Sequence, residues 1–322
     1  MKTAVILLNL GGPDSLEAIE PFLYNLFSDP DIFNLPFGQK LFAKLISGRR
    51  APKVQKEYEL IGGKSPINEW TELQRSMLEN ELRQADTGID VIIAMRYWHP
   101  LTDEAVKIVE NGNYDKILML PLYPHFSVST TGSSFNEWAR IYNGDDSKLV
   151  FVKDYFENDL YIKAINERID ETLNLFPETV KDDVQLVFSA HGTPVSMVKK
   201  GDPYSIQIKK TVDKVMQMRN NSHDHHLCFQ SKVGPVKWLE PSTDQMIESL
   251  SAQGKKNLLI IPISFVSDHV ETLFELDIEY RHVADKCEIE NYIVMKGLND
   301  SKTFIEALSN IALEHLKIQI KV

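Results

Sequence analysis

A histidine and a file of acidic residues lie in two separate segments of the chain, and each segment follows an apolar run. His191 stands in "SAHGTP", directly after the run Val184–Phe188. The acids stand in "SFVSDHVETLFELDIEY", which follows "NLLIIP". At about 100° per residue, their spacing predicts one side of a helix, within an arc of roughly 80°. The acids are Asp268, Glu271, Glu275 and Glu279, and His269 lies near the start of the file.

Imidazole and carboxylate groups of this kind suit proton transfer near neutral pH or the binding of a divalent cation. Each feature also has an ordinary structural explanation. The acids would form the solvated face of an amphipathic helix, and His191 would only hydrogen-bond a turn. The position of both segments at the carboxyl ends of apolar runs favours the chemical interpretation, because ligands bind at that edge of open α/β sheets.

Short apolar runs alternate with amphipathic stretches along the whole chain, which predicts parallel sheets covered by helices on both faces. The expected strands are "AVILLNL", "VIIAMR", "KILMLPL", "KLVFVK", "VQLVFSA", "HLCFQS" and "NLLIIPI". The expected helices are Glu69–Gln84, Asp103–Glu110, Ile162–Leu175, Ser205–Met218, Thr243–Ser251 and Thr303–Leu316.

An internal repeat divides the chain into two similar halves. The interval from Thr102 to Pro121 equals the interval from Thr243 to Pro262, and both hold a helix, a turn, a strand and a proline. The pattern predicts an α/β fold of two doubly wound, Rossmann-like parallel-sheet halves with the active-site cleft between them. We expect residues 1–150 to form the first half and 151–322 the second, with a last helix that could pack back on the first half.

The composition excludes several classes of protein. The net charge of −11 argues against a general nucleic-acid binder, which needs a positive field. The two cysteines, Cys228 and Cys287, have no partner at metal-site spacing, which fits a reducing compartment. The apolar runs are shorter than the ~20 residues that span a bilayer. The simplest expectation is a cytoplasmic protein.

An inserted segment at about 30–66 differs in character from the rest of the first half. It mixes apolar residues such as Phe33, Phe37 and Leu41 with charges that are all positive from Lys40 to Lys53. Such a segment suits a flat apolar ligand with acid groups, or a membrane surface. A helical hairpin that merely packs on the core is the structural alternative.

Several long strings in the chain, in matching order, resemble the ferrochelatase family over nearly the whole length. They are "LLNLGGP", "RRAPKVQKEYELIGGKSPI", "RYWHP", "STTGSS", "FSAHGTP", "GDPY", "FQSKVGPVKWLEPSTD" and "SDHVETLFELDIEY". The resemblance implies an enzyme, a lyase that inserts Fe²⁺ into protoporphyrin IX with release of two protons, in the last step of haem biosynthesis. A cobalt chelatase for a sirohydrochlorin-type ring and a two-lobed binding protein for a metal or small acid are the alternatives.

The same resemblance implies roles for individual residues. His191 and Glu271 match the catalytic and metal-site pair, and Asp268 and His269 match residues beside that glutamate. Glu275 and Glu279 match an acidic file on a helix with a π-type turn, and the four form the expected path for metal or protons. Porphyrin-binding positions match Arg49, Arg50, Lys53, Tyr58, Ser65, Arg140, Trp238 and Phe265. Leu10 stands where some members carry a tyrosine.

The resemblance also sets the expected partners. Protoporphyrin IX and Fe²⁺ are substrates, no cofactor is tightly bound, and no iron–sulfur cluster is expected, because the chain ends at "HLKIQIKV" without a cysteine-bearing extension. No nucleic acid is expected. A monomer or homodimer with peripheral membrane contact through residues 30–53 fits the pattern.

Overall fold

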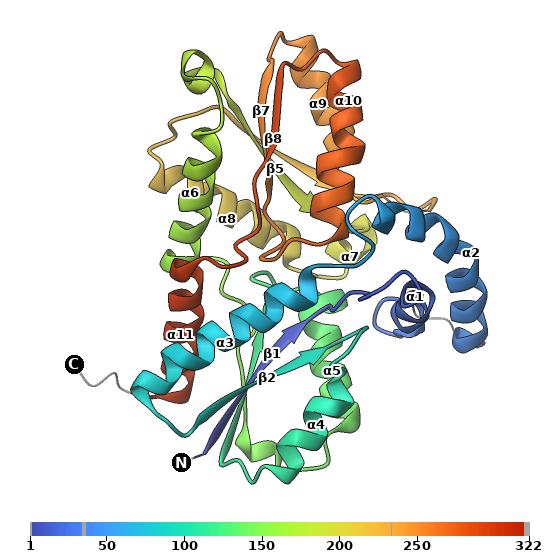
Figure 1. Cartoon of the computed structure of the whole chain (residues 1–322), viewed down its shortest axis with the longest axis vertical. Coiled ribbons are helices and arrows are strands. Elements are labelled where there is room, and N and C mark those ends of the chain that lie inside the picture. Colours follow the sequence, from blue (N-terminus) through green and yellow to red (C-terminus); the bar gives the residue numbers. More distant parts are fainter. Residues whose placement is uncertain (1, 34–36, 233, 319–322) are drawn as a thin grey trace. The chain divides into compact units, whose positions relative to one another are not determined.

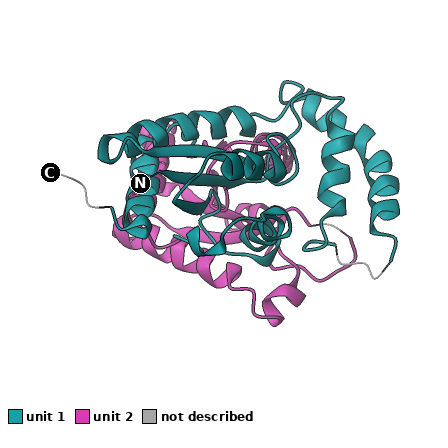
Figure 2. Ribbon diagram, turned by 90° about the horizontal axis from the view of Figure 1, so that it is seen from below, with its two compact units in different colours: residues 1–155, 299–322 teal, residues 156–298 magenta. Residues whose placement is uncertain are grey.

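Figure 1 shows the computed structural model of the chain, which describes residues 2–33, 37–232 and 234–318. The chain folds into two compact units, coloured separately in Figure 2. Unit 1 contains residues 1–155 together with 299–322, and unit 2 contains residues 156–298. The last helix therefore belongs to unit 1.

Each unit contains one sheet of four parallel strands with the same connectivity, which confirms the predicted α/β fold of two similar halves. The order is β2-β1-β3-β4 in unit 1 and β6-β5-β7-β8 in unit 2. The unit 1 strands are β1 Thr3–Asn9, β2 Ile89–Met95, β3 Lys116–Pro121 and β4 Leu149–Phe151. The unit 2 strands are β5 Gln185–His191, β6 His225–Gln230, β7 Asn257–Pro262 and β8 Asn291–Val294.

Helices cover the first sheet on both faces. Alternate residues of β1, including Ile6 and Leu8, pack with α4 and α5 around the buried Trp138. Helices α3 and α11 pack against each other and against β2, β3 and β4. The helices of unit 1 are α1 Ile19–Ser28, α2 Gln39–Glu59, α3 Ile67–Ala85, α4 Thr102–Asn111, α5 Ser133–Ile141 and α11 Lys302–Leu316. A π-helical turn, η1 Val128–Gly132, leads into α5, and a 3-10 turn, η2 Asp146–Lys148, precedes β4.

The second sheet is covered in the same way. Val187, Leu258 and Ile260 pack under α9 and the helix that follows β7. Ser242 caps the start of α9, and its backbone N–H donates to Gln245 Oε1 at 3.1 Å, one half of a capping box. The helices of unit 2 are α6 Asp159–Leu173, α7 Val195–Lys199, α8 Tyr204–Met218, α9 Thr243–Ala252 and α10 Tyr280–Lys286. A 3-10 turn, η3 Glu178–Asp183, precedes β5, and the π-helix η4 Glu271–Glu279 runs into α10.

The inserted segment of unit 1 folds largely as the helix α2, which packs on the preceding helix α1. Ala43, Ser47 and Ala51 form the buried side of α2. Residues 34–36 of the expected insertion lie outside the described residues. None of the helices in the described part of the chain is long and apolar enough to cross a membrane.

Two features differ from the sequence prediction. Strand β8 was not predicted, because "NYIV" is short and lies at the edge of its sheet, where its burial is only partial. The acidic helix also begins later than its spacing suggested. Its first turn starts at Glu271, with Val270 as the capping position, so Asp268 and His269 precede it.

Candidate active site

The carboxyl end of β5 places His191 at the edge of the second sheet. In the strand register, His191 lies opposite Gln230 of β6. Its backbone N–H donates to Ser264 Oγ at 2.8 Å, and the Tyr204 hydroxyl donates to its carbonyl oxygen at 3.0 Å. The next residue must be small, because a Cβ on Gly192 would lie 2.5 Å from the Gln230 carbonyl oxygen. The backbone that carries the imidazole is therefore held by the segment that follows β7 and by the first residue of α8.

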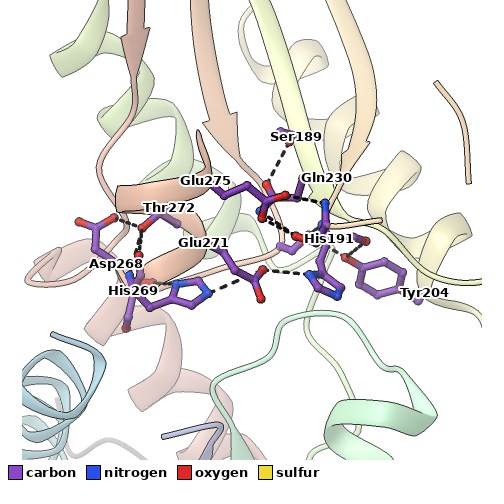
Figure 3. Close-up of polar contacts among 12 residues, drawn as sticks. Ser189, His191, Tyr204, Gln230, Asp268, His269, Glu271, Thr272 and Glu275 are labelled. Atoms are coloured by element: carbon purple, nitrogen blue, oxygen red, sulfur yellow. Dashed lines mark hydrogen bonds and ion pairs between the residues drawn. The ribbon is translucent and has the colours of Figure 1, made fainter. Parts of the chain in front are cut away.

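Glu271, the first residue of η4, reaches the imidazole of His191. Its Oε2 atom lies 2.9 Å from His191 Nδ1 (Figure 3). Since a carboxylate only accepts, Nδ1 carries the hydrogen and the lone pair of Nε2 is left for another partner. The two side chains are 39% and 25% exposed, so the pair remains accessible. Burial opposes charge on both groups, yet their mutual attraction prevails: the pKa of His191 is raised and that of Glu271 is lowered.

His269 presents a second imidazole to the same carboxylate. Its Nδ1 donates to the Ser267 carbonyl oxygen at 3.1 Å, and its Nε2 lies 3.9 Å from Glu271 Oε2. Among the described residues, that Nε2 atom is buried without a hydrogen-bond partner. Burial lowers the pKa of His269, against the opposing effect of Glu271. The ring is thus neutral near pH 7, with a free lone pair on the side of Glu271.

Glu275 lies one turn further along η4 and faces the end of β6 instead of His191. Its carboxylate accepts from the Ser231 N–H at 2.7 Å, the Ser231 hydroxyl at 2.5 Å and Gln230 Nε2 at 3.2 Å. Tyr280 donates to it at 3.2 Å. Burial and the neighbouring charge of Glu271 raise the pKa of Glu275 to about 7. The group therefore changes protonation state near neutral pH.

The two ends of the acidic file behave differently from its centre. Asp268 is buried and accepts from the Thr272 hydroxyl and from the Gly297 N–H, at 3.1 and 3.0 Å. The sequence prediction that Asp268 shares the helix face is wrong, because the helix starts after it. Glu279, at the last position of η4, is exposed.

Aromatic rings border the imidazoles. The Phe265 ring stands edge-on to both, with centroids 6.1 Å from His191 and 4.4 Å from His269. Trp238 is half-buried on the segment that pairs with Pro194 through an isolated bridge. Unit 2 thus brings His191, His269, Glu271, Glu275 and Phe265 together from β5, the β7–η4 loop and η4.

The remaining predicted residues lie in unit 1. Arg49, Arg50 and Lys53 are exposed on α2, where Arg50 stacks over Phe27 at 5.6 Å and Lys53 pairs with Glu57 at 3.5 Å. Two others are buried and help to shape the unit. Tyr58 lies in the last turn of α2, and Ser65 donates its N–H to the Pro13 carbonyl oxygen at 2.8 Å. A Cβ at Gly12 would meet Ser65 at 2.5 Å, which requires glycine in "LGGP".

Arg140 and Arg96 belong to an ion-pair network at the edge of the first sheet. Arg140 binds Asp31 and Glu137 at 2.7 and 3.0 Å. Arg96, which the sequence reasoning did not single out, lies 3.1 Å from the fully buried carboxylate of Asp29. Asp29 also accepts from the Tyr97 and Ser133 hydroxyls.

Sequence reasoning also missed the residues that hold the site of unit 2: Tyr204, Gln230, Ser231 and Ser264. The strings "GDPY" and "FQSK" contain three of them, and the position of "FQSK" at a strand end was the available signal. Within the described part of the chain, no group of three or more histidine, cysteine, aspartate or glutamate side chains has the arrangement of a metal site.

The fold is one that metal chelatases use. The structure of SirB from Bacillus subtilis with Fe³⁺ matches with a TM-score of 0.55 at 12% identity and covers all of both chains. The sirohydrochlorin chelatase SirB from Bacillus subtilis subspecies spizizenii in complex with cobalt gives 0.53 at 11% identity, again over all of both chains. At these identities the likeness shows the fold alone.

The family follows from sequence similarity. The ferrochelatase family model matches residues 2–316. The ferrochelatase of Geotalea daltonii is 46% identical over 96% of this chain and 97% of its own length. That of Gloeobacter violaceus is 43% identical over 98% of both. The chain belongs to the ferrochelatase family, the metal chelatases that were expected from its motifs.

Proposed function

We propose that this enzyme inserts Fe²⁺ into protoporphyrin IX and releases two protons to form protohaem, the last step of haem biosynthesis. The observation that carries the proposal is the 2.9 Å contact between His191 and Glu271 at the end of β5, in a chain of this family. The reaction removes two pyrrole protons and strips water from a divalent cation. It therefore needs a basic lone pair, a carboxylate and an apolar wall at one place.

His191 is the proposed acceptor of a pyrrole proton and a ligand of the incoming ion. Its Nδ1–H is held by Glu271, which fixes the tautomer and turns Nε2 toward the reactants. Glu271 stabilises the imidazolium that forms when Nε2 takes the proton. The two groups titrate as a pair, so the first proton is assigned to the pair and not to one member.

Glu275 and Glu279 are the proposed path along which protons or metal move away from that pair. Glu275, with a pKa of about 7, can accept and return a proton at physiological pH. Glu279 is exposed and would pass the charge to solvent. His269 keeps a lone pair on the side of Glu271 and joins this path, whereas Asp268 supports it by tying the loop before η4 to Gly297.

The porphyrin-binding roles rest on chemistry that each unit offers separately. Phe265 and Trp238 supply apolar walls in unit 2 against which a bent macrocycle can pack. Arg49, Arg50, Lys53 and Arg140 offer cationic groups in unit 1 that suit propionate carboxylates. Tyr58 and Ser65 are buried and would act by holding α2, the helix that carries Arg49, Arg50 and Lys53.

One experiment separates this function from its two rivals. The protein is mixed anaerobically with protoporphyrin and Fe²⁺ or Zn²⁺, and the porphyrin absorption spectrum is followed. Conversion to the metalloporphyrin is expected. Binding without turnover would favour a binding protein. Turnover only with Co²⁺ and a polycarboxylate ring would favour the sirohydrochlorin-type chelatase, whose known structures share this fold.

We also propose that the enzyme is cytoplasmic and touches the membrane through the start of α2. Phe37, Leu41 and Leu45 are 92%, 65% and 67% exposed, and Lys40 and Lys44 lie between them. Apolar side chains flanked by lysines match the acyl and anionic headgroup layers of a bilayer.

Sedimentation with vesicles of phosphatidylglycerol and phosphatidylcholine tests this contact. The wild type should bind and Leu41→Glu should not. Leu175 is equally exposed at 68% but lies in unit 2, so Leu175→Glu is the matched control and should bind like the wild type. Equal sedimentation of the two variants would refute the assignment of this surface.

A further inference from the structure

The segment that ends β6 holds the carboxylate of Glu275 with an unusual concentration of donors. Among the described residues, this carboxylate accepts four hydrogen bonds, and three of them come from two consecutive residues, Gln230 and Ser231 (Figure 3 shows the contacts around Glu275). Ser231 contributes two of them, its N–H to Oε1 at 2.7 Å and its hydroxyl to Oε2 at 2.5 Å. Both carboxylate oxygens are therefore bound by one residue, which fixes the rotation of the carboxylate as well as its position.

The backbone of Ser231 is bent to allow this grip. Its φ angle is 64°, in the left-handed region that residues other than glycine, asparagine and aspartate seldom adopt. In this conformation the N–H and the hydroxyl point at the same partner. Ser231 thus has a strained backbone at the edge of the candidate active site, and both of its donors bind the Glu275 carboxylate. Strain of this kind is typical of residues with a functional role.

The donor from Gln230 is set in advance by a second chain of hydrogen bonds. Gln230 is fully buried, and its Oε1 accepts from the Ser189 hydroxyl at 3.0 Å. Ser189 in turn lies 2.8 Å from the Thr243 hydroxyl. Because the amide oxygen is occupied by a hydroxyl, the amide nitrogen must face Glu275. The β6 end thus presents three donors to Glu275, and the direction of the one from Gln230 is set by the hydrogen bond that its amide oxygen accepts from Ser189.

Strand register explains why these residues reach the site. Gln230 lies opposite His191, and the Gly192 N–H donates to the Gln230 carbonyl oxygen at 2.9 Å. Glu275 belongs to the helix after β7, on the other side of β5. The side chain of Glu275 therefore crosses the end of β5 and is held by residues at the end of β6.

We propose that Ser231 is the positioning residue for Glu275: its paired donors hold that carboxylate beside the His191–Glu271 pair, so that it can relay the proton or ion that the pair passes on. This inference rests on the proposed function, because it assumes that Glu275 lies on the path. Ser231 touches no reactant in this account and acts only through Glu275.

The test is a double-mutant cycle on Zn²⁺ insertion into protoporphyrin by the full chain. Ser231→Ala removes the hydroxyl donor and keeps the N–H. Loss of one hydrogen bond to a charged acceptor should lower kcat about tenfold and leave the KM for porphyrin within about twofold. Glu275→Gln alone should lower kcat by at least the same factor. In the Glu275→Gln background, Ser231→Ala should change kcat by less than about twofold.

Two further variants separate the hydroxyl from the backbone and from general effects. Ser231→Gly relieves the left-handed conformation but lacks the same hydroxyl, so it should lose as much kcat as Ser231→Ala. Ser251 is a half-buried serine of the same unit whose hydroxyl donates to the Cys287 carbonyl oxygen at 2.6 Å. Ser251→Ala is the matched control and should keep wild-type kcat. Circular dichroism and urea unfolding establish that each variant is folded.

The outcomes distinguish this proposal from the proposed function. A wild-type kcat for Ser231→Ala, or an undiminished effect of Ser231→Ala in the Glu275→Gln background, would overturn the positioning role. A wild-type kcat for Glu275→Gln would also overturn the positioning role of Ser231. If His191→Ala were inactive in the same assay, the proposed ferrochelatase function would still stand. Full activity of His191→Ala would remove the proposed site itself.

Discussion

The two units build the same strand ends and use them differently. Leu8 of β1 pairs with Pro121 as Ser189 of β5 pairs with Pro262, so Leu10 occupies in unit 1 the place that His191 occupies in unit 2. By the same registers Arg96 corresponds to Gln230. A π-helical turn follows the third strand in both units, η1 in one and η4 in the other. The scaffold is repeated, and the side chains placed on it are not.

The two units differ in whether the polar side chains at their strand ends find all their hydrogen-bond partners inside the same unit. In unit 1, Arg96, Asp29, Tyr97 and Ser133 bind one another in a buried network. In unit 2, His191 and His269 each use Nδ1, on Glu271 and on the Ser267 carbonyl oxygen, and among the described residues His269 Nε2 has no hydrogen-bond partner. A network with all its partners stabilises a unit, and a network with lone pairs to spare can bind an ion or take a proton.

A large effect on activity is expected at Glu271, the partner of His191 in unit 2. Glu271→Gln removes the charge that stabilises the imidazolium of His191, and the rate of metal insertion should fall about 100-fold. The free energy of unfolding should change by less than about 1 kcal/mol, because Glu271 is partly exposed. Insertion kinetics and urea unfolding measure the two quantities. If Glu271→Gln lost stability but kept its activity, Glu271 would have a structural role, like the buried network of unit 1, and not a catalytic one.

The opposite result is expected in unit 1. Asp29→Asn leaves the Arg96 guanidinium without its buried counter-charge, which should cost about 3–5 kcal/mol of unfolding free energy in urea. Asp31 provides the matched control, because its partner Arg140 is 41% exposed. Asp31→Asn should cost less than about 1 kcal/mol. Equal losses in the two variants would show that burial of the Asp29 network adds nothing.

A smaller effect is expected on how the free energy of unfolding depends on pH, because of the raised pKa of Glu275. Its pKa is raised to about 7 in the folded chain, so folding favours its protonated form. The resulting loss of stability is absent at pH 4.5 and below and complete above pH 7, with an upper limit of about 3 kcal/mol. Urea unfolding at pH 5 and pH 8 should give a larger decrease for the wild type than for Glu275→Gln. Identical decreases would contradict the raised pKa.

The sequence predicts the strands, the repeat and the row of glutamates for clear physical reasons. Apolar runs such as "NLLIIP" are buried on both faces, so their pattern is unambiguous, and equal intervals from Thr102 and Thr243 reveal the repeat. Helical periodicity stacks Glu271, Glu275 and Glu279, and it does so in a π-helix as well as in an α-helix. The resemblance supplied the pairing of His191 with Glu271, which lie 80 residues apart.

The parts that sequence could not supply depend on three-dimensional partners. Asp268 fits the helical spacing, but its carboxylate accepts a hydrogen bond from the Gly297 N–H. No local pattern in the sequence predicts that contact. The grip of Ser231 on Glu275 depends on a left-handed backbone angle and on the order β6-β5-β7. Arg96 begins the string "RYWHP", but that string does not reveal its ion pair with the buried Asp29, which only the structure shows.

The central claim is that the imidazole of His191 carries out the chemistry at the end of β5. The most direct measurement is the initial rate of Fe²⁺ insertion into protoporphyrin by His191→Ala, recorded anaerobically beside the wild type at equal concentrations of folded protein. We expect a rate at least about 1000-fold below that of the wild type, with an unchanged circular dichroism spectrum. A rate within tenfold of the wild type would contradict the account.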